Sequence, residues 1–581
     1  MFLFFNNYLY VIVKNYKNMK EYIHRFYSTT AFTNHINNNY YEPWVSSHLT
    51  NTAETSSVTI TYNLKELGMP LTFEIVSGGT LYWRANDISN TAYTRTFEYR
   101  KNDGEWTEIT SSKDNGGSGT TICDVVAGDI VQFRGDNVSY SHGSSSNFNR
   151  YNGFTSDALF YCYGNIMSLI SSTDFITRTG FTTNYVFPYL FYNCTGLLSH
   201  DIKKLCLPAK SVTQNSYQYM FANCTSLTIA PELPATNLDG NTQYQGMFQG
   251  CTSLIKTPSA LPATYVPSIG YDNMFAGCTS LVRTAFRTLP ATVLGTGCYS
   301  SMFKNCTSLI ECPHLIAPTQ LTTDVYAYMF QGCTSISEAP TIIADKICQN
   351  GYRNMFDGCT SLINIKNITL PCTTTASRQY EAMFQNCSSL VDGQIYIGVE
   401  SVGQFTFNCM FKGCNKLEKA PNIFVTGMTG ESVFVSMFEG CTKLQSVPFT
   451  ALTPTTLTGH CYKYMFKNCT SLTTAPQILA TSTSGTSRCC DSMFYGCSNL
   501  TTAPDLLPDT LSYCCYEQMF RGCSKLNYIK CLATTSISGN VNNWVTGVQT
   551  TSGTFVKAAS MNDWPTGNSG IPTNWTVMDA S

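Results

Sequence analysis

The feature that most constrains this chain is an internal repeat of about 27 residues. A string of the form M-F-x-(G/N)-C-(T/S)-x-L recurs in thirteen near-copies between Phe187 and Leu526, in steps of 26 to 30 residues. Such a period is typical of arrays in which each unit packs on its neighbours. The thirteen repeated cysteines, called the ladder cysteines below, are Cys194, Cys224, Cys251, Cys278, Cys306, Cys333, Cys359, Cys387, Cys414, Cys441, Cys469, Cys497 and Cys523.

Apolar residues occupy three of the positions that precede each ladder cysteine. Phe stands three residues before every one, Met four before in all units but the first (Leu190), and an aromatic residue seven before in all but one (Cys490). These offsets place the side chains on one face of a short helix. The residue directly before each cysteine is Gly or Asn, which tolerate the left-handed conformation that ends a helix. The pattern therefore predicts one short, capped helix per unit.

The other half of the repeat carries a leucine three residues after the cysteine (Ile336 in one unit) and, in eight units, a proline seven residues after it. Because proline cannot donate to a β-ladder, we expect a short strand that ends before it. One unit is too small to bury its own apolar residues, whereas stacked units can. The predicted fold class is a repeat solenoid, a β/α leucine-rich-repeat array, preceded by a small all-β domain.

The repeat M-F-x-G-C-T-S-L-x-x-x-P-x-L-P resembles the BspA-type leucine-rich repeats of Bacteroidetes surface proteins. The tail is also similar to the segment that closes such arrays, in residues 544–548, 553–557 and 570–577. We expect Trp564 and Trp575 in this tail to cover the open apolar face of the last unit.

Residues 54–140 are predicted to form a small, sandwich-like β-domain. Segments 58–62 and 71–75 alternate apolar and polar residues, and 130–133 follows a turn. Segments 97–100 and 106–109 flank Asn-Asp-Gly, a strong hairpin signal.

The predicted division is an attachment segment (1–53), the β-domain (54–140), a linker and N-terminal cap (141–186), the solenoid of thirteen units (187–531) and a C-terminal cap (532–581).

The segment 20–46, which contains Tyr-Tyr-Glu-Pro-Trp-Val at 40–45, together with the β-domain resembles the N-terminal modules of fibre-like proteins of Bacteroidetes phages and related host proteins. Glu42, Pro43 and Trp44 are the candidate attachment residues. The resemblance implies that the N-terminus binds other virion proteins and that the distal part is displayed.

The apolar run 1–13 is short for a membrane span and lacks the basic start and cleavage site of a signal peptide. A start at Met19 would leave no export signal.

The composition excludes several classes of function. Lys and Arg number 35 against 37 Asp and Glu, and charged residues make up only 12%. We therefore expect no nucleic-acid partner and no polybasic membrane patch. The chain contains no H-E-x-x-H, C-x-x-C or glycine-rich phosphate motif. The sequence accordingly predicts no catalytic residue, no metal and no cofactor.

The 27 cysteines are interpreted mainly as packing residues. The ladder cysteines occupy a slot used once per turn, and small thiols pack well in such a slot. Four others stand eight residues before a ladder cysteine and are expected to form a second buried column, in which occasional disulfides and the redox state stay open. These four are Cys298, Cys461, Cys489 and Cys515.

The residues between the repeated positions vary in length and identity, which is where binding usually occurs on a regular scaffold. We therefore interpret the chain as a non-catalytic display or adhesion protein that binds a host-surface protein or glycan.

The fibre-like N-terminus favours a phage virion fibre or decoration protein, located on the virion. The alternative is a secreted or cell-surface adhesin of a gut Bacteroidetes bacterium. A glycan-processing enzyme would need clustered His, Asp and Glu, which the spacing does not supply. The oligomeric state stays open.

Overall fold

The computed structural model describes residues 62–86, 94–113, 119–141, 151–315, 321–343, 348–370, 374–393, 395–449, 451–483, 485–549 and 551–581. Glu42, Pro43 and Trp44, and the strand expected at 58–62 apart from Tyr62, lie outside these residues. Within the described ranges, no helix is long and apolar enough to cross a membrane.

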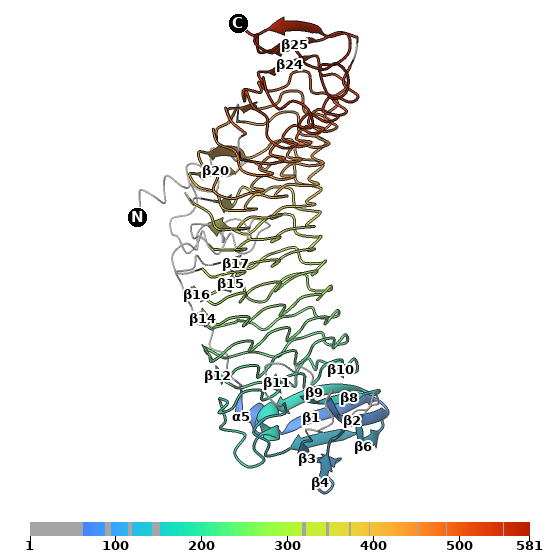
Figure 1. The fold of residues 1–581 in the computed structure, drawn as a ribbon. Coiled ribbons are helices and arrows are strands. Elements are labelled where there is room, and N and C mark those ends of the chain that lie inside the picture. The colour runs from blue at the N-terminus through green and yellow to red at the C-terminus, as the bar shows by residue number, and fades with distance from the viewer. Residues whose placement is uncertain are drawn as a thin grey trace, which may run out of the picture. The chain divides into compact units, whose positions relative to one another are not determined.

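The region before the array is built mostly of strands in two sheets (Figure 1). One sheet has the order β10-β9-β1-β7-β3-β4, with β11 also paired to β9, and the other joins β5, β6 and β8 to β2. The elements are α5 (Leu64–Leu67), β1 (Leu71–Ser77), β2 (Gly79–Asn86), β3 (Thr96–Lys101), β4 (Thr107–Thr110), β5 (Ser112–Lys113), β6 (Thr120–Val125), β7 (Ile130–Arg134), β8 (Tyr151–Ser156), β9 (Leu159–Asn165), the 3-10 helix η2 (Ile166–Leu169), β10 (Leu197–Leu198) and β11 (Leu205–Cys206).

The two sheets share an aromatic core that continues into the first repeat. Phe73 of β1 lies 5.1 Å from Phe154 of β8, between ring centroids, and Phe154 stacks on Phe191 at 5.6 Å. The predicted hairpin is confirmed, because β3 pairs antiparallel with β4. Asn102 and Asp103 between them both have positive φ, as the tightest hairpin turns require. The β-domain therefore covers the N-terminal end of the repeat core.

The strand-rich region extends beyond the end that the sequence suggested. The expected boundary lies at residue 140, whereas β8 and β9, from the segment 141–186, pair with β2 and β1. The reason is that their inward residues, such as Phe154 and Phe160, complete the apolar core. This segment thus supplies both sheet strands and the junction to the array.

Each repeat is wound from consecutive tight turns, and the predicted short helix is wrong. The residues one, five and nine positions before every ladder cysteine have φ between 50° and 80°. A left-handed residue at every fourth position interrupts the hydrogen bonds from residue i to i−4 that define an α-helix. Instead, the Met220 N–H donates to the Tyr217 carbonyl within its turn (3.3 Å), while the Phe221 N–H donates to the Met247 carbonyl of the next repeat (2.9 Å).

This alternation makes the array a solenoid of stacked turns, so the predicted repeat stacking is confirmed (Figure 1). The left-handed conformation predicted for the Gly or Asn before each ladder cysteine is also confirmed at all thirteen positions.

The paired extended segments are short and lie after the proline position, so the expected strand before proline is wrong. Before proline, the residue five positions after a ladder cysteine forms only isolated bridges, as in Glu338 with Asn364. The longer ladders begin where successive backbone N–H groups are again available. They are β12 (Ser211–Val212), β13 (Asn237–Leu238), β14 (Tyr265–Val266), β15 (Thr288–Leu289), β16 (Val293–Leu294), β17 (His314–Leu315), β18 (Ile342–Ile343), β19 (Ile368–Thr369), β20 (Tyr396–Val399), β21 (Asn422–Val425), β22 (Ala451–Leu452) and β23 (Gln477–Ile478).

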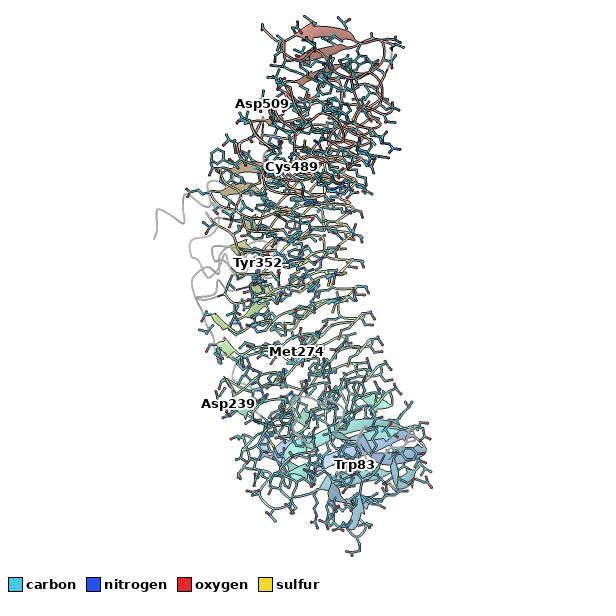
Figure 2. All side chains as sticks on the ribbon, viewed as in Figure 1. Trp83, Asp239, Met274, Tyr352, Cys489 and Asp509 are labelled. Carbon is cyan, nitrogen blue, oxygen red and sulfur yellow. The ribbon has the colours of Figure 1, made fainter. Side chains whose placement is uncertain are left out.

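Two columns of aromatic rings run through the array. The phenylalanines three residues before the ladder cysteines, from Phe191 to Phe520, stack with centroids 5.3–5.9 Å apart and interplanar angles of at most 23°. The second column runs from Phe187 to Tyr462 at 5.4–6.3 Å. Met274 and Tyr352, labelled in Figure 2, belong to this interior. Identical rings thus lie in register from one repeat to the next, at spacings favourable for offset stacking.

A further turn, without a cysteine, follows the thirteenth repeat. The Phe520 N–H donates to the Trp544 carbonyl, so Trp544 takes the place that Met occupies in the repeats, and Val548 takes that of the ladder cysteine. Trp564 stacks on Trp544 with centroids 5.8 Å apart. The parallel strands β24 (Tyr528–Cys531), β25 (Thr554–Lys557) and β26 (Thr576–Asp579) complete this end. The tail therefore covers the last apolar layer.

Replacing Gly358 should separate the demand for a left-handed residue from the demand for space. Gly358 has φ +75°, and a β-carbon there would meet no atom closer than 3.7 Å. We expect Gly358→Val to lower the free energy of unfolding by about 1–2 kcal/mol because of backbone strain, and Gly358→Asn to change it little. Urea unfolding followed by circular dichroism would measure both, and equal stabilities would contradict this explanation.

Candidate functional site

The ladder cysteines lie in one buried column, each fully excluded from solvent. From the second repeat on, each thiol donates to the carbonyl of the repeated phenylalanine in the preceding unit, with S···O distances of 3.0–3.2 Å. The same carbonyl accepts the N–H of the cysteine in its own unit, as Phe221 does from Cys224. The thiol therefore supplies a donor between repeats, which an apolar side chain such as valine would lack.

Burial sets the protonation state of these thiols. Loss of solvent raises the pKa of Cys251, Cys306 and Cys497 to about 12, well above the ordinary value for cysteine. The thiolate is the nucleophilic form, so this column is chemically inert near neutral pH. The ladder cysteines are free thiols in the structure.

The second set of cysteines is also buried. Cys298, Cys461, Cys489 and Cys515 are fully excluded from solvent, and the Cys461 thiol lies 3.7 Å from the Cys489 carbonyl oxygen. Hydrogen bonds with Cys490 and Cys515 lower the pKa of Cys489, and the same contact with Cys489 raises that of Cys515. Cys489 is labelled in Figure 2. This end of the array thus holds a small thiol cluster where Cys490 replaces the repeated aromatic ring.

The surface over the tight turns, called the turn face, carries charges that pair between repeats. Glu439 accepts from Lys412 (2.9 Å) and Lys467 (3.2 Å), which lie in the repeats on either side. Burial disfavours ionisation of Glu439, but the hydrogen bonds from Lys412 and Ser436 hold its pKa below the ordinary value. Further along, Arg488 donates to Asp491 and Glu517 at 3.0 and 2.8 Å. These ion pairs link neighbouring turns of the array.

The carboxylates at variable repeat positions likewise have structural partners. Glu232 accepts from the backbone N–H of Ser259 at 2.8 Å, and Asp505 pairs with Lys530 at 2.8 Å. Asp357 accepts from Gln331 and Asn354 at 2.9 and 3.1 Å. Among the described residues, no group of three or more His, Cys, Asp or Glu is placed to hold a metal ion. These three carboxylates link neighbouring repeats.

A different surface, called the strand face, is formed by the outward positions of β19, β20 and β21. Tyr396 is 61% exposed and Phe424 is 49% exposed, although their neighbours Ile397 and Ile423 are buried. These two aromatic residues stand outside the repeated positions and are not among the residues predicted from the sequence. The signal that would have found them is the strand alternation in Tyr-Ile-Gly-Val and Asn-Ile-Phe-Val.

The family of the chain follows from the repeat itself. The sequence profile of the BspA type leucine rich repeat region matches six copies, over residues 161–310, 296–419 and 410–543. The chain belongs to this family. The resemblance noted in the sequence is thereby confirmed, and no catalytic family is indicated. Leucine-rich repeat proteins are typically non-enzymatic proteins that bind through an extended surface.

Two solved structures are similar to this BspA-type chain. A leucine-rich repeat protein from Bacteroides ovatus ATCC 8483 is 15% identical with a TM-score of 0.40, and the match covers 69% of this chain and 88% of that one. A leucine rich cell surface protein from Faecalibacterium prausnitzii A2-165 is 17% identical with a TM-score of 0.26, covering 58% of this chain and 86% of that one. No curated protein matches this chain.

Maleimide labelling should distinguish the buried ladder thiols from accessible ones. In the native protein we expect no label on the ladder cysteines and slow label on the half-buried Cys123 and Cys409, because only exposed thiolates react. After denaturation without reductant, every ladder cysteine should be labelled. Peptide mass spectrometry locates the label, and ladder cysteines that stay unlabelled after denaturation would reveal disulfides and contradict the thiol-to-carbonyl ladder.

Proposed function

We propose that this BspA-type chain is a non-catalytic adhesion protein whose repeat array binds a component of a cell surface. The observation that carries the proposal is the contrast between the regularly repeated interior and the variable exterior of the array. The buried columns repeat residue by residue, while outward positions change from one repeat to the next. A rigid scaffold of this kind presents an extended surface without a centre for chemistry.

Low surface charge supports adhesion to a protein or glycan rather than to a polyanion. The chain has a net charge of −2, and several turn-face charges pair with one another, as Glu439 does with Lys412 and Lys467. A nucleic-acid or membrane-surface protein would instead present unpaired basic residues. The surface is therefore suited to a neutral or weakly charged partner.

The finer proposal concerns where the array is displayed. The resemblance of the N-terminal residues to fibre-like modules supports a phage virion fibre or decoration protein that contacts the bacterial host. The alternative is an adhesin on the surface of a gut Bacteroidetes cell, which membership of the BspA-type family supports. The two settings share the same binding array and differ in what holds the N-terminus.

The adhesion proposal is tested with the full chain carrying a fluorescent label. We expect saturable binding to intact gut bacteria or to epithelial cells, competed by unlabelled protein and abolished when the label is carried by heat-unfolded chain. Absence of saturable binding to both cell types would overturn the proposal. Mass spectrometry of purified virions and of bacterial envelopes would decide the setting: recovery in virions supports the fibre, and recovery in envelopes supports the adhesin.

A further inference from the structure

The strand face carries a pair of exposed aromatic side chains on adjacent repeats. β20 and β21 pair in parallel over four residues, with Tyr396 opposite Asn422 and Gly398 opposite Phe424. Since side chains alternate along a strand, Tyr396, Gly398, Asn422 and Phe424 all face outward. The two aromatic residues therefore sit on neighbouring rungs, about 4.8 Å apart along the array, and two positions apart along the strand.

Gly398 leaves the space in which the Tyr396 ring lies, because it has no β-carbon. A β-carbon built on Gly398 would come within 2.4 Å of the Tyr396 ring and 2.7 Å of its hydroxyl oxygen. The ring therefore lies down along its own strand, over the glycine, with one flat side turned to solvent; its 61% exposure fits this placement. Phe424 borders the same spot from the next rung. The result is a small aromatic platform, defined here as Tyr396, Gly398 and Phe424.

The surroundings of the platform are polar and carry one exposed carboxylate, Glu400, at the outward position that follows Gly398. Thr369 lies outward on β19 and Asn422 outward on β21, both exposed and both able to hydrogen-bond a ligand. Before β20 and β21, Asp392 and Lys419 form an isolated backbone bridge, and their side chains pair at 3.4 Å. No described outward residue of β19, β20 or β21 carries a charge. The outward residues of the three strands therefore complement a neutral ligand, and the nearby Glu400 carboxylate disfavours an anionic one.

The size of the platform argues against a protein partner. A stable protein interface buries about 800 Å² on each side and centres on side chains that fill pockets. Two flat rings edged by a hydroxyl and an amide match a smaller ligand that has one apolar face and a polar edge. A pyranose ring has this form, because its C–H groups stack on an aromatic face while its hydroxyls point outward.

We propose that Tyr396 and Phe424 form a binding platform for a neutral, hexose-based glycan. Gly398, which lacks a β-carbon, leaves room for the Tyr396 ring to lie along the strand. This inference rests on the proposed adhesion function and names the ligand class for it. Thr369 and Asn422 supply hydrogen bonds at the edge of the sugar. Adjacent sugar units would stack on successive rungs.

The test uses the full chain on a printed array of neutral hexose, N-acetylhexosamine and sialylated oligosaccharides, followed by calorimetric titration with the neutral oligosaccharide that binds best. Tyr396→Ala and Phe424→Ala are each expected to weaken that binding at least 10-fold. Gly398→Ala keeps both rings but forces the Tyr396 ring away, and we expect a similar loss. Tyr513→Ala removes an equally exposed tyrosine outside the platform and should leave affinity unchanged.

Each outcome bears on the inference. Preference for sialylated glycans, absence of binding to any glycan, or unchanged affinity in Tyr396→Ala would overturn it. The same variants applied to the cell-binding assay separate it from the proposed function. Cell binding that persists in Tyr396→Ala and after periodate oxidation of surface glycans would overturn the glycan platform alone, whereas absence of cell binding by the parent chain would overturn adhesion itself.

Discussion

Replacement of Phe330 by alanine should lower the free energy of unfolding by about 3–5 kcal/mol, the usual cost of removing a fully buried aromatic side chain. Phe330 lies in the middle of the phenylalanine column, stacked on Phe303 at 5.7 Å and on Phe356 at 5.5 Å. Its loss opens a cavity and also removes ring contacts on both sides. Because each repeat contacts only its neighbours, no distant contact compensates. Guanidinium unfolding followed by circular dichroism would measure the change.

Phe424→Ala is the matched control for this prediction. Phe424 is also a phenylalanine of the array, but it is 49% exposed and outside the column, so its loss should cost less than about 1 kcal/mol. Limited proteolysis adds a second readout, since a weakened interface should make the chain cleavable near residue 330 before it unfolds as a whole. Equal destabilisation by the two substitutions would contradict the stacked-column account.

The repeat period, the buried positions and the left-handed Gly or Asn were predictable because each leaves a compositional mark. The tight turns were not. Offsets of three, four and seven residues fit both a helix of 3.6 residues per turn and a chain of turns that repeats every four residues. What decides between them is the left-handed conformation five and nine positions before each cysteine. Those positions hold residues as varied as Tyr219, Ala382 and Ile269, so the residue types there do not indicate a left-handed conformation.

The strand positions were misplaced for a related reason. A proline such as Pro421 predicts the end of a strand, but a residue without an N–H can equally stand just before one, as Pro421 does before β21. The surface platform was missed because exposed aromatic residues carry no repeat. Tyr396 and Phe424 become recognisable only when burial of Ile397 and Ile423 fixes which side of each strand faces out. The buried positions can be predicted because the same residue types recur there in every repeat. The residues of a binding surface cannot, because they differ from one repeat to the next.

Stability should fall steeply as the pH rises above about 9, because the buried thiols resist ionisation. Burial raises the pKa of Cys251, Cys306, Cys414 and Cys497 to about 12 from the usual 9.0. Above pH 9 the unfolded chain releases these protons while the folded chain retains them, so folding is disfavoured increasingly up to pH 12. Each thiol contributes about 1.4 kcal/mol per pH unit, and these four together roughly 5 kcal/mol per pH unit.

The measurement is the urea midpoint and slope at intervals from pH 7 to 11, with thiols kept reduced. Cys306→Val with Cys414→Val is the matched variant, since Val548 occupies the equivalent place in the last turn. We expect this double variant to be less stable at pH 7, because two S–H donors are lost, but to lose stability with pH less steeply, by roughly two protons. Buried tyrosines such as Tyr271, whose pKa burial also raises, would add to the fall above pH 10 in both proteins. A stability that stays level between pH 8 and 11 would contradict the protonated thiol ladder, and identical slopes in the two proteins would assign the alkaline loss to the tyrosines instead.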